Sequence, residues 1–168
     1  YFLGRLTRIL EANGKRPAVW NEAIEGGELA RSTRVHGWES VKACLDATAA
    51  GYRTVVMPGQ YFYFDMRQSP HEDGHDWAAI FDVRKTYSFD FARCGFTPAQ
   101  EANVLGVEGA FFSELYVSHN PETPDYLDYM TFPRACALAE LGWSEGVREW
   151  TEFYRRLRSH YDRMGAQG

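Results

Sequence analysis

The 168-residue sequence has little of what marks membrane, nucleic-acid-binding or disulfide-stabilised proteins. It has no apolar run near the ~20 residues that span a bilayer. Its net charge of −5 comes from interspersed acidic and basic residues, with no basic stripe for nucleic acid and no polybasic membrane patch. Cys44, Cys94 and Cys136 are widely spaced and lack zinc or redox spacing. We therefore expect idle or buried thiols, and neither a nucleic acid nor a membrane as partner.

The 168 residues contain no signal-peptide pattern, which says little about the compartment, because they open with Tyr1 and run directly into a helical pattern. The sequence leaves the compartment open between the bacterial cytoplasm, the periplasm and secretion. The odd number of cysteines mildly disfavours a secreted protein built on disulfides.

Aromatic residues, by contrast, are abundant and make up 15% of the sequence. Most aromatic side chains fill protein cores, but their rings also stack on the apolar faces of sugar rings. The hydrophobic share of 45% is enough for one domain with a core.

Helical and strand patterns alternate along the chain. Helices are expected at 2–13, 28–31, 40–50, 124–143 with a break at Pro133, and from Trp150 to Tyr161, and strands at 16–20, 33–38, 52–57 and 104–112. Residues 68–76 are expected to form a loop, and 97–100 a capped turn. Such alternation favours an α/β fold with a parallel sheet. Four strands are half of a (β/α)8 barrel, although a doubly wound open sheet fits the same periodicity.

An aromatic residue stands at the carboxyl end of each of the four predicted strands, and at three of the four ends an acidic residue accompanies it. These residues are Trp20 with Glu22, Trp38, Tyr63 with Asp65, and Phe112 with Glu114. If the strands are parallel neighbours, these side chains converge at one edge of the sheet. Rings to stack on sugar faces and carboxylates to accept hydroxyl hydrogen bonds are what a sugar pocket needs. Packing is the plainer interpretation of any single tryptophan at a strand end.

Six stretches then resemble the catalytic domain of glycoside hydrolase family 20, the β-N-acetylhexosaminidases, and bacterial chitobiase-type members in particular. They are residues 19–22, 51–57, 63–65, 84–89, 105–114 and 132–143. The resemblance extends over nearly the whole chain, and it is most specific at Tyr63-Phe-Asp65 and around Pro133 and Arg134. It implies that residues 1–168 are the carboxyl-terminal half of a TIM barrel, with strands five to eight and the terminal helices of one catalytic domain.

The resemblance also implies site roles. Tyr63 would donate a hydrogen bond to the carbonyl oxygen of the substrate's 2-acetamido group. Asp65 and Glu114 would hold sugar hydroxyls, and Trp20 and Trp38 would line the pocket. The remaining position, Phe112, is a tryptophan in the family, so the indole N–H and some stacking area are missing here.

The implied activity is hydrolysis of terminal N-acetylglucosamine or N-acetylgalactosamine residues from β-linked glycans, with retention and with the acetamido group as nucleophile. The family's adjacent Asp-Glu pair belongs upstream of the first strand of this chain, which contains no Asp-Glu dipeptide. We therefore expect an isolated chain to be inactive, and to associate with the missing amino-terminal half of the barrel or with a second copy. No cofactor and no metal are implied.

Two other interpretations remain. The chain could be a non-catalytic carbohydrate-binding or interaction module that uses the same residues. His71 and His75, four residues apart with acidic residues around them, could ligate zinc if that segment were helical, whereas Gly74 favours a solvated loop that borders the pocket. Arg134 and Glu140 are expected to form a structural ion pair or to anchor their helix.

Overall fold

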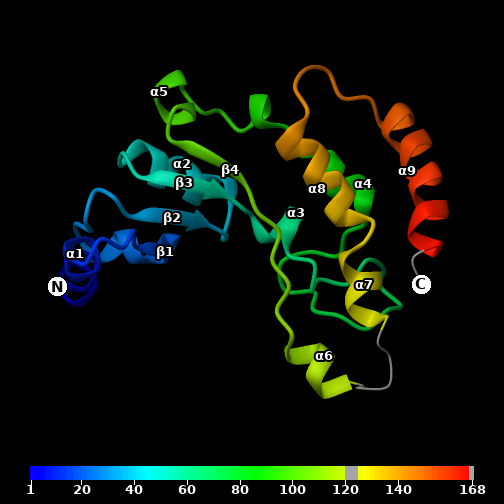
Figure 1. The fold of residues 1–168 in the computed structure, drawn as a ribbon, viewed down its shortest axis with the longest axis horizontal. Helices are drawn as coiled ribbons and strands as arrows, with labels where there is room; N and C mark the ends of the chain where they lie inside the picture. The colour runs from blue at the N-terminus through cyan, green and yellow to red at the C-terminus, as the bar shows by residue number, and fades with distance from the viewer. Residues whose placement is uncertain (120–124, 167–168) are drawn as a thin grey trace. The chain divides into compact units, whose positions relative to one another are not determined.

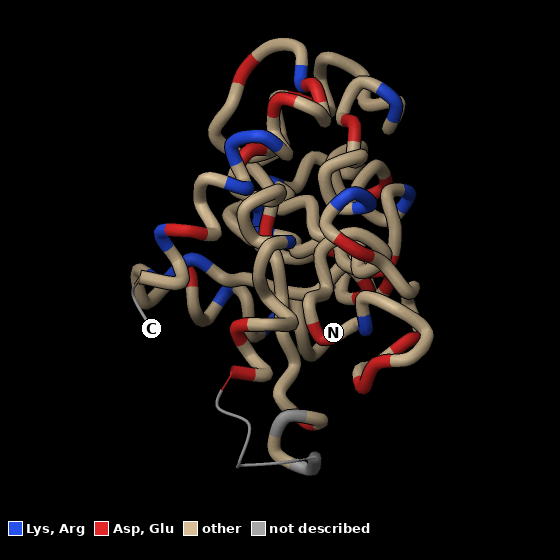
Figure 2. Tube along the Cα trace, turned by 90° about the vertical axis from the view of Figure 1, so that its right-hand side faces the viewer, with Lys and Arg blue, Asp and Glu red and all other residues tan. Residues whose placement is uncertain are grey.

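The computed structural model describes residues 1–119 and 125–166 (Figure 1). The chain divides into two compact units. The first comprises Tyr1–Tyr63 and Asp90–Ala110, and the second comprises Phe64–Phe89 and Phe111–Gly168. Acidic and basic residues are interspersed along the trace (Figure 2). None of the helices in the described ranges is long and apolar enough to cross a membrane.

The first unit contains a four-stranded parallel sheet. Its strands are β1 (Ala18–Trp20), β2 (Arg34–Gly37), β3 (Arg53–Val56) and β4 (Val104–Val107), in the order β1-β2-β3-β4. Each neighbouring pair is parallel. Every strand therefore lies beside the next one along the chain, as in successive βα units of a barrel, and the order does not reverse as it does at the switch point of a doubly wound sheet. The predicted α/β class with four parallel strands is confirmed.

Helices of the first unit flank this sheet. They are α1 (Phe2–Ala12), the 3-10 helix η1 (Asn21–Gly26), α2 (Val41–Ala49), α3 (Gly59–Phe62), the 3-10 helix η2 (Phe91–Arg93) and α5 (Pro98–Glu101). Ser40 caps α2 by accepting a hydrogen bond from the N–H of Ala43, as its sequence predicts. Val35 of β2 and Ala47 of α2 are both fully buried in the core between sheet and helix.

The predicted helix over 28–31 is wrong. The chain instead forms η1 directly after β1, and Gly27 ends it with φ of 116°, a conformation that favours glycine. The next N–H groups have tertiary partners, because that of Leu29 donates to Tyr52 Oη (3.2 Å) and that of Ala30 to Thr7 Oγ1 (3.1 Å). These two bonds hold Leu29 and Ala30 against distant parts of the chain in an irregular conformation.

The predicted strand over 104–112 is too long, because β4 ends at Val107. Its neighbour β3 ends at Val56, after which Pro58 and α3 turn the chain away from the sheet. Beyond β4 only scattered pairing remains, such as the N–H of Ala110 donating to the carbonyl oxygen of Phe62 (3.0 Å). A strand needs a partner along its length, and the partner here is short.

The second unit is helical. Its helices are α4 (Val83–Tyr87), α6 (Glu114–His119), α7 (Tyr126–Thr131), α8 (Arg134–Trp143) and α9 (Trp150–Gly165). The break expected at Pro133 is confirmed and separates α7 from α8, while residue 124, where that helix was expected to begin, lies outside the described residues. The ring-rich face of α9 packs into a core of Tyr87, Ala137, Phe153 and Leu157. The expected packing role therefore holds for Phe153, Leu157 and Trp150, whereas Tyr154 and Tyr161 of the same helix remain exposed.

Candidate functional site

The carboxyl ends of β1 and β2 are joined by a buried asparagine. Asn21, which is 4% exposed, accepts hydrogen bonds from the backbone N–H groups of Trp38 (3.0 Å) and Glu39 (3.4 Å) and donates to Glu39 Oε2 (2.6 Å). The indole Nε1–H of Trp38 donates to Glu22 Oε2 at 2.9 Å. The segment that follows β1 thus holds both the backbone and the ring of Trp38. Within this segment, Glu22 orients the indole.

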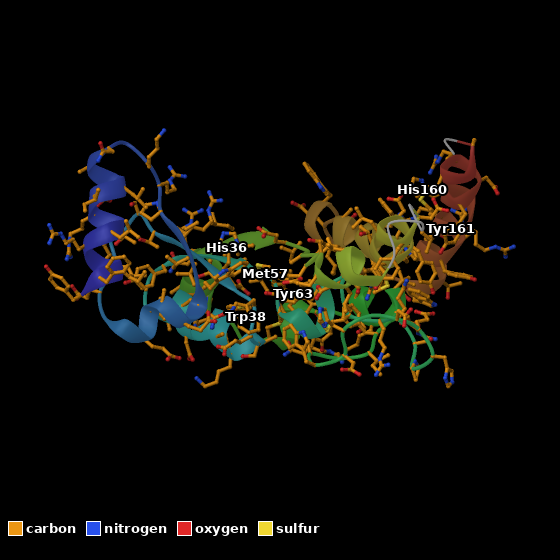
Figure 3. All side chains as sticks on the ribbon, turned by 90° about the horizontal axis from the view of Figure 1, so that it is seen from below. His36, Trp38, Met57, Tyr63, His160 and Tyr161 are labelled. Atoms are coloured by element: carbon orange, nitrogen blue, oxygen red, sulfur yellow. The ribbon has the colours of Figure 1, made fainter. Side chains whose placement is uncertain are left out.

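Trp38 and Tyr63 are in contact. Their rings stack with centroids 6.0 Å apart and planes 18° apart, and Figure 3 shows both side chains beside the end of β3. Tyr63 closes α3, where its N–H donates to the carbonyl oxygen of Gly59 (3.3 Å), and it forms an isolated parallel bridge with Ala110. It is only 3% exposed, so packing and backbone bonds fix its ring.

Trp20 lies beside His36, which in turn is close to Glu108. Its ring meets that of His36 edge-on, with centroids 5.9 Å apart and an angle of 78°. His36 Nδ1 is 3.3 Å from Glu108 Oε2. With Ala18 these residues border a hollow of about 280 Å³, and Trp20 remains 46% exposed. His36 and Glu108 were not predicted as site residues, although His36 lies two residues before Trp38 and so on the same side of the extended chain.

Asp65, in the second unit, has a deeply buried carboxyl group. The residue is 2% exposed, and neither carboxylate oxygen has a hydrogen-bond partner within the described part of the chain. Burial raises the pKa of Asp65, and the neighbouring Glu114 adds to that, whereas nearby backbone amides and the His75 imidazole lower it. A buried carboxylate without a donor is costly, so the position suits a ligand that brings its own donor.

Phe112 and Glu114 do not stand at a strand end, since β4 ends at Val107. Phe112 is 37% exposed, and Glu114 is the exposed first residue of α6. The prediction that these two residues stand at the end of a strand is therefore wrong. They lie in the segment between β4 and α6 and at the start of α6. Glu114 is close enough to Asp65 to influence its pKa.

The loop over 68–76 is confirmed as a loop and is attached to the chain around Asp65. Met66 and His75 form an isolated parallel bridge, the N–H of His75 donates to the carbonyl oxygen of Asp65 (2.9 Å), and Arg67 pairs with Asp76. Across 1–119 and 125–166, no group of three or more histidine, cysteine, aspartate or glutamate residues is placed to hold a metal ion. Residues 71–75 are not helical, so the condition on which the zinc alternative at His71 and His75 depended is not met.

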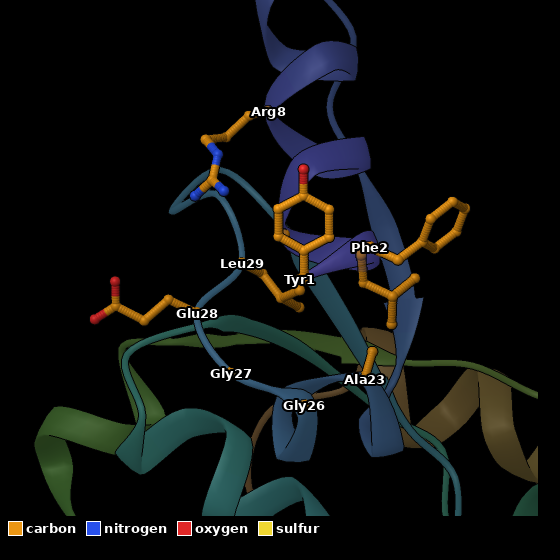
Figure 4. A pocket seen from close by; sticks show the side chains of 10 residues that line it. Tyr1, Phe2, Arg8, Ala23, Gly26, Gly27, Glu28 and Leu29 are labelled. Atoms are coloured by element: carbon orange, nitrogen blue, oxygen red, sulfur yellow. The ribbon is translucent and has the colours of Figure 1, made fainter.

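One further hollow, of about 470 Å³, lies between the start of α1 and the segment after η1 (Figure 4). Tyr1, Phe2 and Arg8 border it on one side, and Gly26 to Leu29 on the other. It includes none of the site residues predicted from the sequence.

Comparisons with known proteins agree on one family. Residues 1–146 match the model of the glycosyl hydrolase family 20 catalytic domain. The β-hexosaminidase of Vibrio furnissii is 31% identical over 136 residues, which cover 79% of this chain and 21% of that protein.

Solved structures point to the same family. The exo-β-N-acetylglucosaminidase of Vibrio harveyi, solved with N-acetylglucosamine, is 32% identical with a TM-score of 0.87 over 99% of this chain and 26% of that one. The β-N-acetylhexosaminidase of Streptomyces coelicolor A3(2) is 29% identical with a TM-score of 0.80, over 98% of this chain and 34% of that one. This chain thus spans about a fifth to a third of the length of these relatives. Because the family model covers most of its residues, the chain belongs to glycosyl hydrolase family 20.

Proposed function

We propose that residues 1–168 form the carboxyl-terminal part of one catalytic domain, corresponding to strands five to eight and the terminal helices of a (β/α)8 barrel. The parent enzyme removes terminal N-acetylglucosamine or N-acetylgalactosamine residues from β-linked glycans. The observation that carries this proposal is the buried carboxylate of Asp65, which has no protein donor among the described residues. A sugar hydroxyl supplies that donor in a charge-assisted hydrogen bond.

The stacked pair of Trp38 and Tyr63 suits an acetamido sugar. The indole provides an apolar face, and the phenol provides a donor on a ring held almost parallel to it. Tyr63 donates to the carbonyl oxygen of the 2-acetamido group, while Glu22 keeps the indole in place through its hydrogen bond to Nε1. Trp20 and Phe112 add aromatic surface, and Glu114 binds a further hydroxyl.

The mechanism that fits these groups is retaining and substrate-assisted. The acetamido oxygen attacks the anomeric carbon and forms a C–O bond as the bond to the leaving oxygen breaks. A carboxylic acid protonates that leaving oxygen. Water then opens the resulting oxazolinium ring with retention. The hydrogen bond from Tyr63 holds the acetamido oxygen in the direction of the anomeric carbon. The attack is then an intramolecular step between groups that are already oriented, which lowers its entropic cost.

The carboxylic acid comes from an Asp-Glu pair in the amino-terminal part of the same domain, since no such dipeptide occurs in this chain. Asp65 and Glu114 serve as ligands of hydroxyl groups rather than as proton donors. On this proposal the chain alone binds part of the sugar and does not cleave it.

The test compares the chain alone with the complete catalytic domain on a nitrophenyl N-acetylglucosaminide. We expect no nitrophenol from the chain and steady release from the complete domain. In that domain Tyr63→Phe should lower kcat on the order of 10²-fold, as the loss of one oriented donor does elsewhere. Tyr61→Phe removes a hydroxyl two residues away and should leave kcat unchanged.

Nitrophenol release by the chain alone would contradict the missing acid. Full activity of Tyr63→Phe would contradict the role of Tyr63. Binding of N-acetylglucosamine without turnover by the complete domain would instead indicate a non-catalytic sugar-binding module.

A further inference from the structure

Arg134 has no exposed surface, and it is the first residue of α8. Its guanidinium donates to the carbonyl oxygens of Phe64 (2.7 Å), Met66 (2.7 Å) and Phe81 (3.3 Å), and twice to that of Met130. The guanidinium carbon also lies 5.3 Å from the ring centroid of Phe64 and 4.8 Å from that of Phe81. All of its hydrogen-bond donors are therefore directed at backbone of the second unit.

The expected ion pair between Arg134 and Glu140 does not form. Glu140 pairs with Arg156 of α9 instead, at 2.5 and 2.7 Å. Burial lowers the pKa of Arg134 to about 10, while the carboxylates of Asp65 and Glu72 raise it. The side chain stays charged at neutral pH, and it anchors its helix through carbonyl oxygens rather than through a carboxylate.

Two of the carbonyl groups that Arg134 holds flank Asp65. The carbonyl of Phe64 precedes Asp65 and that of Met66 follows it, and the carbonyl of Asp65 itself accepts the N–H of His75 at 2.9 Å. Three successive carbonyls are thus fixed, two of them by one planar guanidinium. With its backbone held in this way, Asp65 retains only the freedom of its side chain.

We propose that Arg134 is a positioning residue for Asp65, and that it orients the sugar-binding carboxylate by clamping the peptides on both sides of it. The inference rests on the proposed function, because it requires Asp65 to bind a substrate hydroxyl. Burying a charge without a carboxylate partner is an expensive way to anchor a helix. An arginine suits this position because its planar guanidinium has five N–H donors, which can hold several carbonyl groups in one fixed geometry. A lysine ammonium cannot do this.

The test is a double-mutant cycle in the complete catalytic domain. Arg134→Lys keeps the charge but loses the fork, and we expect KM to rise roughly tenfold, which corresponds to about one oriented hydrogen bond. Asp65→Asn should raise KM by itself. Because Arg134 acts through Asp65, adding Arg134→Lys to Asp65→Asn should raise KM no further.

A second pair of variants covers the case in which Arg134→Lys fails to fold. Phe81→Leu removes a ring that lies against the guanidinium and leaves Asp65 and its neighbours unchanged. Phe153→Leu is the matched control, since Phe153 is equally buried at 4% against 3% and stacks on Tyr87 of the same unit. Both should lower the free energy of unfolding, but only Phe81→Leu should raise KM, and only while Asp65 is present.

The outcomes separate the two proposals. If Asp65→Asn leaves KM unchanged, the proposed role of Asp65 is refuted and the inference with it. If Asp65→Asn raises KM but the effects of Arg134→Lys or Phe81→Leu are fully additive with it, Arg134 is a structural anchor only and the inference alone is overturned. The same conclusion follows if Phe81→Leu and Phe153→Leu change KM alike.

Discussion

Asp65 shows how a single residue can cost stability for the sake of binding. Its carboxyl group is buried and neither oxygen makes a hydrogen bond within the described residues, so the nearby backbone amides and the His75 imidazole offset only part of the lost hydration. A residue selected for packing alone would not keep a bare carboxylate there. Binding sites commonly carry such a cost, and replacing the costly group then stabilises the fold while it weakens binding.

We therefore predict that Asp65→Asn stabilises the chain at neutral pH. Burial raises the pKa of Asp65 above its unfolded value, so the folded protein binds more protons than the unfolded one between these two values. The contribution of this carboxyl to stability therefore falls as pH rises through that window. Urea unfolding should show Asp65→Asn to be more stable than the unchanged chain at pH near 7, with the difference vanishing towards about pH 4, the ordinary range of aspartate.

Asp162→Asn is the control for this measurement, because Asp162 is exposed on α9. Asp162→Asn should leave the pH dependence of the free energy of unfolding the same as in the chain without substitutions. A chain that becomes less stable at neutral pH on Asp65→Asn would show that the carboxylate has an unrecognised donor in the folded state.

Part of the candidate site could be predicted from the sequence, because strand ends can be recognised locally. Aromatic residues after β2 and β3 pointed to a shared edge, and the structure places Trp38 against Tyr63. Asn21 and Arg134 show what is not local. Each acts through hydrogen bonds to backbone that is distant in sequence, and no residue pattern reveals which carbonyl or N–H a side chain will find.

At the scale of elements, the close approach of α2 to β2 depends on a glycine. A Cβ at Gly37 would overlap with Cys44 Sγ and come within 3.3 Å of its Cα. Cys44 is fully buried, its Sγ–H donates to the carbonyl oxygen of Gly37 (3.3 Å), and burial raises the pKa of the thiol to about 12. It is a small packing group in its neutral form, as expected for an idle thiol.

Gly37→Ala should accordingly lower the free energy of unfolding by about 1–3 kcal/mol, the usual cost of overpacking a core. Adding Cys44→Ala removes the overlapping sulfur atom and should restore part of the loss, although contacts with the backbone of residue 44 remain tight. Urea unfolding of the two single variants and the double variant measures the coupling. Additive losses would show that the helix moves away from the sheet at little cost.

Some helix starts could be recognised from local capping residues, whereas α4 was not predicted although Asp82 caps it. Ser40 marks a helix start that the structure confirms, and the capped turn predicted at 97–100 is the capping box of Thr97 and Gln100 that begins the short helix α5. The errors at 28–31 and 104–112 have a common cause. In both segments the backbone hydrogen bonds depend on distant partners, on Tyr52 and Thr7 in one and on the short β3 in the other.

At the scale of the whole molecule, the first unit has a sheet with two open edges. No described strand pairs with the outer side of β1 or of β4. Large apolar side chains on these strands are exposed, Trp20 at 46% and Leu105 at 41%. Unpaired strand edges with exposed apolar residues recruit further chains, and a barrel removes such edges by closing the sheet on itself.

We therefore expect the isolated chain to self-associate in a concentration-dependent way, and light scattering over a dilution series measures this. Leu105→Lys places a charge on the edge strand β4 and should shift the chain towards the monomer. Val147→Lys is the matched control, because Val147 is 92% exposed but lies outside the sheet, and it should leave the association unchanged. Within the complete catalytic domain the same edges are paired on our proposal, so Leu105→Lys should not change its oligomeric state. A stable, folded monomer of the isolated chain at all concentrations would mean that its sheet edges need no partner, and it would contradict the assignment of the chain to half of a barrel.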